Sequence, residues 1–361
     1  MNDLTRYDLG LSRREAARLL AAVAAGPALL EPLERWLRSP LRRPVAEGHG
    51  TLNVEELEHL EAAAYVFRQW DDTVGGGLRR KAVVGQLGEV CEILHGPLAA
   101  DLRARLLSTA ARLAETAAIM SWDSGLQGAA QRYYTLGFRA AHEAGDRSFA
   151  AYTLAGTARQ LVCLGGACDA LELTRIALRI APGRDIPGLQ ALLLLRQAWA
   201  YAAQGRVVRF EATVDQAREA FEDAQAGQTP PWLGHFDHAE FVGTVGGRYL
   251  ELARRDSSLA GSAIEWTTQA IAARPAGRLR SNALDHLGLT ESWIIAGDLD
   301  QAATAGHWAA DAAQQTRSDR VTVQIEDLLA RADRADPVDR ADRIDHSPLA
   351  DLRDRLLSLS R

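Results

Sequence analysis

Residues 297–309 read GDLDQAATAGHWA, and the spacing within this stretch decides the fold class. Gly297 opens a turn, Ala302 follows five residues later, and Ala309 follows twelve residues after the glycine. Two antiparallel helices approach each other closely only where their facing positions carry small side chains. The stretch therefore predicts a tight turn that leads into a helix packed against its neighbour.

The same order of a turn glycine followed by small residues recurs along the chain. It is found at Gly125 with Ala130 and Gly137, at Gly165 with Ala170 and Ala177, and at Gly205 with Ala217. Neighbouring glycines of this series lie 40 residues apart, a period typical of arrays of helical pairs. Ala263 and Ala270 keep the alanine spacing without the glycine, and RRDSSLAGS (254–262) predicts a lengthened turn there.

The composition fits an ordinary globular protein, with 361 residues of which 47% are hydrophobic and 24% charged. Strings such as LQALLLLRQAWAYAA (189–203) carry apolar residues at helical spacing, with almost none of the alternation typical of strands. We predict an all-α fold, a tetratricopeptide-repeat-like solenoid of helical pairs with a concave groove. The larger residues expected to fill the gaps between pairs are Tyr134, Leu164, Trp199 and Trp308.

Three regions are expected along the chain. Residues 1–110 form an N-terminal helical region, residues 111–330 the repeats, and residues 331–361 a charged linker with a C-terminal helix. The strings VEELEHLEAAAYVFRQWDD (54–72) and LRRKAVVGQLGEVCEIL (78–94) predict two amphipathic helices in the first region.

The N-terminal segment determines the expected location of the protein. Ser12-Arg13-Arg14 followed by LLAAVAAGPALL (19–30) is similar to a twin-arginine export signal. The apolar run is broken by Gly26-Pro27 and is too short to span a bilayer, so we predict a packed N-terminal helix instead. Three cysteines without C-x-x-C spacing imply neither a disulfide framework nor a zinc site. We expect a cytoplasmic protein without a membrane partner.

Several strings resemble the motifs of one protein family. They are WDDTVGGGLRR (70–80), SWDSG (121–125), AQRYYTLGFRAAHEAGD (130–146), PPWLGHFDHAE (230–240) and the pair Ser318 and Arg320. Together they resemble actinobacterial transcriptional regulators with tetratricopeptide-repeat domains. The resemblance covers about residues 10 to 330.

This resemblance implies a regulator of secondary metabolism or sporulation. In the family, a helix-turn-helix of the XRE type usually precedes the repeats. Here only MNDLTRYDLG (1–10) precedes the segment that begins at Arg13, so we expect the helix-turn-helix to be absent. Direct DNA binding is therefore not carried over. A net charge of −6 and a pI of about 5.9 also disfavour nucleic acid as a partner.

The first helix of each pair is expected to line the concave groove. Counting back from the turn glycines places seven residues on that face, namely Glu115, Trp122, Asp123, Tyr152, Arg159, Trp199 and Glu291. Aromatic walls with a few charges suit a peptide or a small amphipathic ligand. The alternative is that Trp122 and Trp199 belong to the core between repeats.

Two further groups of residues are candidate sites. The string HFDHAE places His235 and His238 three residues apart at a predicted helix start, with Asp237 and Glu240 beside them. These four residues are candidates for general acid and base catalysis, whereas Asp237 could instead cap the helix. No third metal ligand is identifiable, so we expect no metal. Arg79, Arg80 and Lys81 form a small basic patch.

Three functions follow, of which a regulatory binding module is favoured. Its partner would be a peptide, a protein or a small metabolite, and a homodimer is left open. The second is a transcriptional regulator that binds DNA through Arg13, Arg14 and the basic patch, or through a partner. The third is a biosynthetic enzyme, such as a cyclase or isomerase, on a recruited repeat scaffold. No cofactor motif is found.

Overall fold

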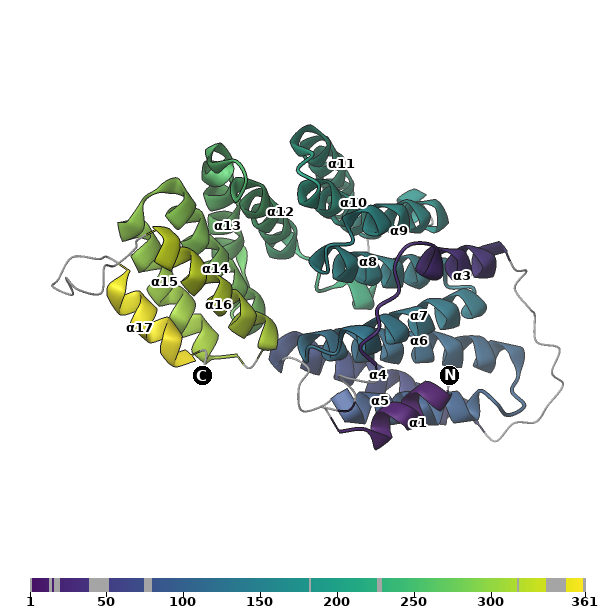
Figure 1. The fold of residues 1–361 in the computed structure, drawn as a ribbon. Coiled ribbons are helices and arrows are strands. Elements are labelled where there is room, and N and C mark those ends of the chain that lie inside the picture. The colour runs from purple at the N-terminus through teal and green to yellow at the C-terminus, as the bar shows by residue number, and fades with distance from the viewer. Residues whose placement is uncertain are drawn as a thin grey trace. The chain divides into compact units, whose positions relative to one another are not determined.

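The computed structural model describes residues 2–12, 15, 20–38, 52–74, 80–181, 183–225, 229–316, 318–335 and 349–359. These residues form α-helices and three short 3-10 helices joined by turns, and no strand occurs among them (Figure 1). The predicted all-α class is therefore confirmed, together with the pairing of adjacent helices.

The chain forms two compact units. The first unit comprises residues 1–72, 76–200 and 216–228, and the second comprises residues 73–75, 201–215 and 229–361. The expected division at residues 110 and 330 stays a prediction.

The first unit is a row of neighbouring antiparallel helices. Its helices are α1 (Asn2–Gly10), α3 (Pro27–Arg38), α4 (Val54–Val74), α5 (Arg80–Ile93), α6 (Ala100–Asp123), α7 (Gln127–Ala144), α8 (Arg147–Cys163), α9 (Ala167–Ile180) and most of α10 (Pro187–Ala203). A 3-10 turn at Gly183–Asp185 precedes α10, and α11 (Val207–Gln225) is shared between the units. Helix α6 packs against α7, α7 against α8, and α8 against α9 (Figure 1).

The Gly-Asp dipeptide explains the turn that opens the repeat pattern. Gly297 ends a helix in the left-handed conformation, with φ at 83°, which glycine adopts without steric cost. Asp298 then caps the next helix, because its carboxylate accepts a hydrogen bond from the amide of Gln301 at 3.0 Å. Gly145 and Asp146 repeat this arrangement between α7 and α8. The dipeptide thus ends one helix and begins the next.

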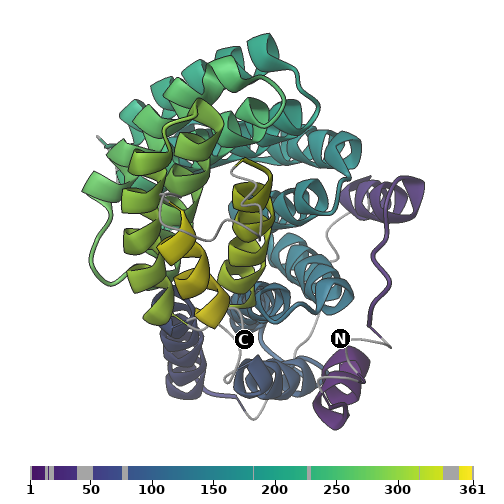
Figure 2. The same ribbon diagram turned by 60° about the vertical axis from the view of Figure 1, so that its left-hand side comes forward.

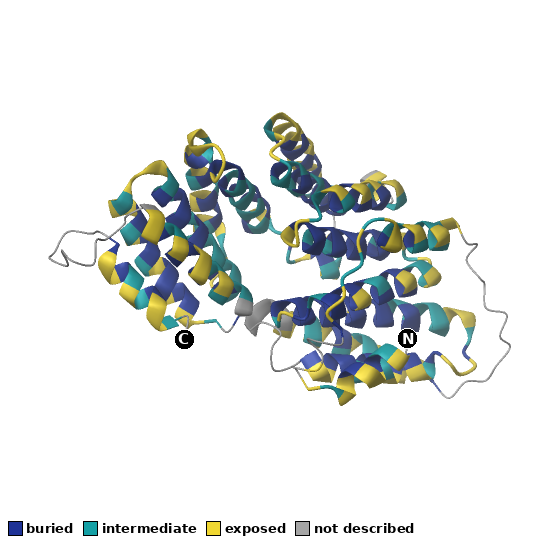
Figure 3. Cartoon of the chain, viewed as in Figure 1, coloured by how far each residue is buried: buried dark blue, intermediate teal, exposed yellow. Residues whose placement is uncertain are grey.

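Small residues stand at the contacts between helices, as predicted. Ala302 and Ala309 are fully buried. A Cβ atom on Gly137 would lie only 3.2 Å from the carbonyl oxygen of Ala111, so α6 and α7 approach closely there. In each unit the facing sides of the helices are buried and the outward sides exposed (Figure 3).

The expected filling of the gaps by large side chains is only partly correct. Tyr134 is buried and Trp199 is half-buried. Leu164 and Trp308 are 46% and 61% exposed, so the expectation is wrong for these two residues. Leu164 fails because it is the C-cap of α8 and lies at the helix end.

A buried ion pair fixes α1 to the first unit. The Arg80 guanidinium donates to Asp8 at 2.8 Å, and the Tyr133 hydroxyl donates to the same carboxylate at 2.6 Å. Burial and the Asp8 charge both raise the pKa of Tyr133, so the phenol stays protonated. Lys81 donates to the carbonyl of Leu11 at 3.0 Å, just beyond the end of α1.

The apolar run at 19–30, expected to belong to a packed N-terminal helix, is helical only from Pro27 onward among its described residues. Residues 21–25 form no helix, and α3 begins only at Pro27. Proline is favoured in the first turn of a helix, and Gly26 before it has a φ of 56°, in the left-handed region that does not continue a helix. The two views place α3 along the outside of α7 and its neighbours (Figures 1 and 2).

The second unit repeats the pairwise packing. Its helices are α12 (His238–Ala253), α13 (Ala260–Ala273), α14 (Leu279–Ala296), α15 (Leu299–Gln314), α16 (Asp319–Ala335) and α17 (Ala350–Leu359), with 3-10 turns at Pro231–Leu233 and Ser257–Leu259. The second 3-10 turn confirms the lengthened turn predicted over 254–262. Helix α17, in yellow, packs against α15 and α16 (Figure 2).

Candidate ligand-binding site

The most distinctive feature of the first unit is an extended stretch of chain held against α7. The amide of Ala24 donates to Oε1 of Gln131 at 2.6 Å, and Nε2 of Gln131 donates to the carbonyl of Ala24 at 2.8 Å. The side-chain amide therefore takes the place of a neighbouring strand. The amide of Gly26 donates to the Asp169 carboxylate of α9 at 2.7 Å. Only backbone atoms of the segment take part in these hydrogen bonds.

A glycine on α7 makes room for the segment. A Cβ atom on Gly128 would lie 1.7 Å from the carbonyl oxygen of Leu20 and 2.8 Å from the carbonyl carbon of Ala21. Such distances are far below van der Waals contact, so no larger residue fits at position 128 while the segment is docked. The Leu20 side chain is 1% exposed. The absence of a side chain at Gly128 thus leaves a notch on α7 in which the backbone of the segment lies.

Helix α3 continues the contact further along α7. The Arg139 guanidinium lies 4.8 Å from the ring centroid of Trp36, and the Phe138 ring lies 6.3 Å from it. Nε2 of His142 lies 3.0 Å from the carbonyl oxygen of Trp36, within hydrogen-bond distance. These contacts hold the last turn of α3 on the same helix that holds Ala24.

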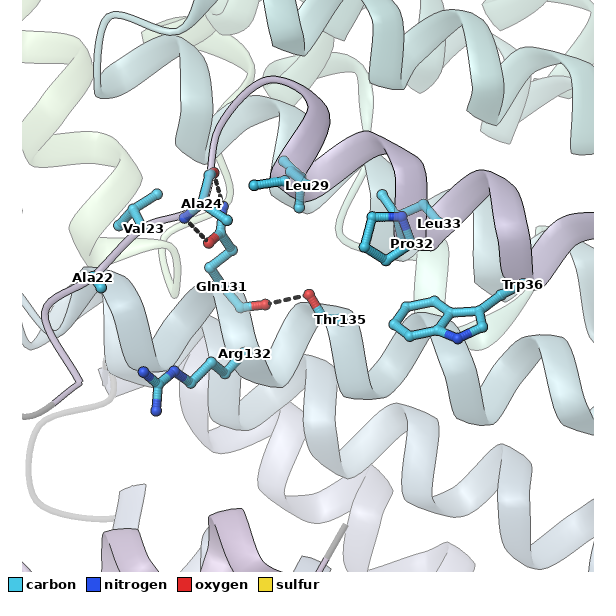
Figure 4. Close-up of a pocket in the computed structure, with 11 residues that line it drawn as sticks. Ala22, Val23, Ala24, Leu29, Pro32, Leu33, Trp36, Gln131, Arg132 and Thr135 are labelled. Atoms are coloured by element: carbon cyan, nitrogen blue, oxygen red, sulfur yellow. Dashed lines mark hydrogen bonds between the residues drawn. The ribbon is translucent and has the colours of Figure 1, made fainter.

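A pocket of about 460 Å³ lies between this N-terminal segment and α7 (Figure 4). Eight lining residues come from the segment, namely Ala22, Val23, Ala24, Ala28, Leu29, Pro32, Leu33 and Trp36. Three come from α7, namely Gln131, Arg132 and Thr135. The size and the largely apolar lining are typical of small-molecule sites.

The polar groups of the pocket differ in how they are occupied. Gln131 binds the backbone of Ala24, and the Thr135 hydroxyl donates to the Gln131 carbonyl at 2.9 Å. Arg132 is exposed and forms no ion pair with the residues that the structure describes. Figure 4 places Arg132 below Ala22 and Val23, at the end of the pocket away from Trp36. The pocket therefore has an apolar end and a cationic end.

Several of the residues predicted for the groove do cluster in the first unit, but they are buried. Glu115 is 4% exposed and accepts two hydrogen bonds from Arg68 of α4, at 2.9 and 3.0 Å. Trp122 is 6% exposed and has the Arg159 guanidinium 4.3 Å from its ring centroid. Burial raises the pKa of Tyr134, whose ring lies among these charges and packs on the backbone of Gly156.

The remaining groove candidates are spread more widely. Asp123 and Tyr152 are buried in the first unit, where the Tyr152 ring lies 5.5 Å from Phe149. Trp199 is half-buried on α10, with the Arg196 guanidinium 5.7 Å from its ring. Glu291 belongs to α14 of the second unit. The assignment of these residues to a ligand groove stays a prediction.

Glu291 has a structural role in the second unit. It is 1% exposed and accepts two hydrogen bonds of 2.7 Å from Arg254. Nε of Arg331 lies 2.8 Å from the same carboxylate. Two guanidinium groups from α16 and from the end of α12 thus neutralise one buried charge on α14.

The HFDHAE string forms a helix start rather than a helical face. Asp237 is the N-cap of α12, since its carboxylate accepts from the amide of Glu240 at 2.8 Å. The helix begins at His238, so His235 lies before it in a turn. The helix start predicted at these histidines is found at His238, and His235 lies outside the helix. The capping role that the sequence left open for Asp237 is confirmed.

Glu240 is engaged in an ion-pair cluster. Arg274 donates to Glu240 at 3.1 Å and to Asp285 at 2.6 and 2.9 Å. Burial raises the pKa of Asp285 to about 7, although the Arg274 charge acts in the opposite direction. Gly243 leaves space for this cluster, because a Cβ atom there would lie 2.7 Å from Arg274. The cluster joins α12, α14 and the end of α13.

Two of the three residues in the predicted basic patch already have hydrogen-bond partners within the protein. Arg80 is 6% exposed in its pair with Asp8, and Lys81 donates to a carbonyl group near the end of α1. Arg79 lies outside the described residues, as do Arg13 and Arg14.

Across the described ranges, no group of three or more His, Cys, Asp or Glu residues is placed to hold a metal ion. Nor is any helix in those ranges long and apolar enough to cross a membrane.

The sequence did not point to the residues that hold the N-terminal segment. Gly128, Gln131 and Asp169 were not predicted as functional. Gly128 offered the one available signal, because a glycine in a helix is destabilising by roughly 0.5–1 kcal/mol relative to alanine unless something needs the space. In comparison with known proteins, no protein-family model matches the chain and no curated protein gives a significant match.

Proposed function

We propose that the chain is a regulatory binding module that holds extended peptide segments of a protein partner on the surface of α7 and α9. The observation that best supports this function is that the amide and the carbonyl of Ala24 both form hydrogen bonds with one side chain, Gln131. Recognition through backbone atoms suits many peptide sequences. The helices already hold one extended peptide in this way.

We also propose that the helical pairs form a tetratricopeptide-repeat-like array and that the protein is related to the actinobacterial regulators. Turn glycines in left-handed conformation and small residues at helix contacts support a tetratricopeptide-repeat-like array. Arrays of this kind present extended surfaces for partners. Together with the resemblance to actinobacterial regulators, this supports a cytoplasmic role in the control of secondary metabolism or development.

The test uses a variant that opens the surface without altering it. Ala24→Pro removes the amide that donates to Gln131, and residue 24 lies outside any helix. A synthetic peptide of residues 20–38 should then bind this full-length variant in calorimetry, and bind the wild-type chain more weakly, because the wild-type surface is occupied.

Two controls make the test specific. Combining Ala24→Pro with Gln131→Ala should weaken peptide binding on the order of tenfold, because two hydrogen bonds are lost. A peptide that itself carries Ala24→Pro should bind weakly to both chains. The proposal fails if no peptide binds the opened chain, or if binding ignores Gln131.

A further inference from the structure

We infer that the pocket between α3 and α7 binds a small amphipathic anion, a molecule with an elongated apolar body and one carboxylate or similar acidic group at its end. This goes beyond peptide binding, because the ligand would lie beneath the docked segment and not replace it. Three features of the pocket favour such a ligand, namely its apolar walls, its single charged side chain and the docked segment that supplies most of its lining.

The walls suit an apolar body. Leu29 and Leu33 project from α3 into the pocket, and Trp36 closes its far end (Figure 4). Leu29 and Leu33 are buried, and the Trp36 ring contacts the Arg139 guanidinium and lies 6.3 Å from the Phe138 ring. An aromatic wall with aliphatic neighbours gains affinity from the apolar surface that a ligand buries.

The single charge of the lining determines the ligand's sign. Arg132 is the one ionisable residue among those that line the pocket, and no described carboxylate pairs with it. The other polar side chains of the lining, Gln131 and Thr135, already use hydrogen-bonding groups within the protein. An anionic group at the Arg132 end would gain charge-assisted hydrogen bonds, whereas a cation would be repelled.

Because the docked segment supplies most of the lining, ligand binding is coupled to docking of that segment. Eight of the eleven lining residues belong to the segment from Ala22 to Trp36. The pocket therefore exists only while that segment lies on α7. By linkage, a ligand that fills it stabilises docking by the same free energy that docking adds to ligand affinity. A metabolite in this pocket would thus hold the peptide-binding surface closed.

Decanoate, decylammonium and 1-decanol serve as probes, because they share one apolar body and differ in charge. In calorimetry with the full chain, decanoate should bind more tightly than decanol, and decylammonium should bind weakest. Arg132→Gln should weaken decanoate about tenfold or more and change decanol by no more than about twofold. Equal binding of decanoate and decylammonium would overturn the inference.

A second variant tests the coupling. Gly128→Ala places a methyl group where Leu20 passes and should abolish binding of both decanoate and decanol, although Gly128 does not line the pocket. Gly85→Ala is the matched control, because a Cβ atom at this helical glycine meets nothing within 4 Å. Retained binding in Gly128→Ala with a folded chain would overturn the inference. The peptide test above uses the opened surface, so the two can fail separately.

Discussion

Segments near both ends of the chain dock through a glycine notch on a helix, but they fill the notch differently. In the first unit, the backbone of Leu20 lies against Gly128, where a Cβ atom would be 1.7 Å from the carbonyl oxygen. In the second unit, the Leu352 side chain of α17 lies against Gly306, where a Cβ atom would be 2.2 Å from Cδ2. A backbone carbonyl cannot rotate away, whereas the end of a leucine side chain can.

The two segments also differ in what holds them. In the N-terminal segment, the amides of Ala24 and Gly26 donate to Gln131 and Asp169, and Gln131 donates back to the carbonyl of Ala24. Helix α17 is held by side chains, with Leu352 buried and Arg355 paired with Asp311. The contrast indicates that residues 24–26 are recognised through their backbone, while Leu20 and Trp36 on either side pack through their side chains. The surface in the second unit recognises one particular helix.

Removing the buried ion pair that precedes the N-terminal segment should have the largest effect. Asp8→Ala leaves Arg80 and Tyr133 without their shared carboxylate, and breaking a buried pair in this way costs roughly 3–5 kcal/mol. Urea denaturation should show the loss in the first unit. Asp8→Asn, which keeps an acceptor, should lose less. Equal losses for the two variants would contradict the role of the carboxylate contacts.

Filling the first notch, at Gly128, should have the second-largest effect on stability. Gly128→Ala forces the Leu20 backbone off α7, and overpacking of this kind typically costs about 1–3 kcal/mol. Alanine at this helical position favours α7 itself, so the helical circular dichroism signal should be unchanged or slightly higher. Amide exchange at residues 20–26 should accelerate more than tenfold. Unchanged exchange in this segment would show that the notch is not needed.

Filling the second notch should reduce the free energy of unfolding by less than filling the first. In Gly306→Ala, the three atoms nearest to the new Cβ all belong to the Leu352 side chain, namely Cδ2, Cδ1 and Cγ, so a rotamer change of this side chain relieves most of the clash. We expect a loss of about 1 kcal/mol in thermal or urea unfolding of the second unit, with α17 still docked. A loss larger than that of Gly128→Ala would reverse the argument.

Removing the exposed ion pair of α17 should have the smallest effect. Arg355 and Asp311 are 31% and 52% exposed in their side chains, and pairs of this kind contribute about 0.2–1 kcal/mol. Asp311→Ala should therefore shift the unfolding midpoint only slightly, and high salt should reduce the difference further. A loss comparable to that of Asp8→Ala would show that burial does not separate the two pairs.

Local sequence rules predicted the helical pairs well because each rule needs only neighbouring residues. The Gly297-Asp298 turn combines a left-handed glycine with a capping carboxylate three residues before the amide that it binds. The alanines at the helix contacts follow from helical spacing alone. The turn over 254–262 could likewise be expected from the missing glycine.

The candidate site could not be predicted in the same way, because its partners are far apart in sequence. The Ala-rich stretch before Gly26 favours a helix by propensity, yet Gln131 binds the Ala24 backbone from 107 residues away. Glu115 was expected to face a ligand, but Arg68, which lies 47 residues earlier, occupies it. The helical spacing of apolar residues gives no information about such long-range pairings.

Amide-resolved hydrogen exchange of residues 24 to 26 in the full chain would show whether the backbone of the N-terminal segment is hydrogen-bonded to α7 and α9. The amides of Ala24 and Gly26 donate to Gln131 and Asp169, whereas the amide of Ala25 makes no hydrogen bond with the described residues. We expect slow exchange at 24 and 26 with fast exchange at 25 between them. Fast exchange at all three positions, or helical protection across them, would contradict it.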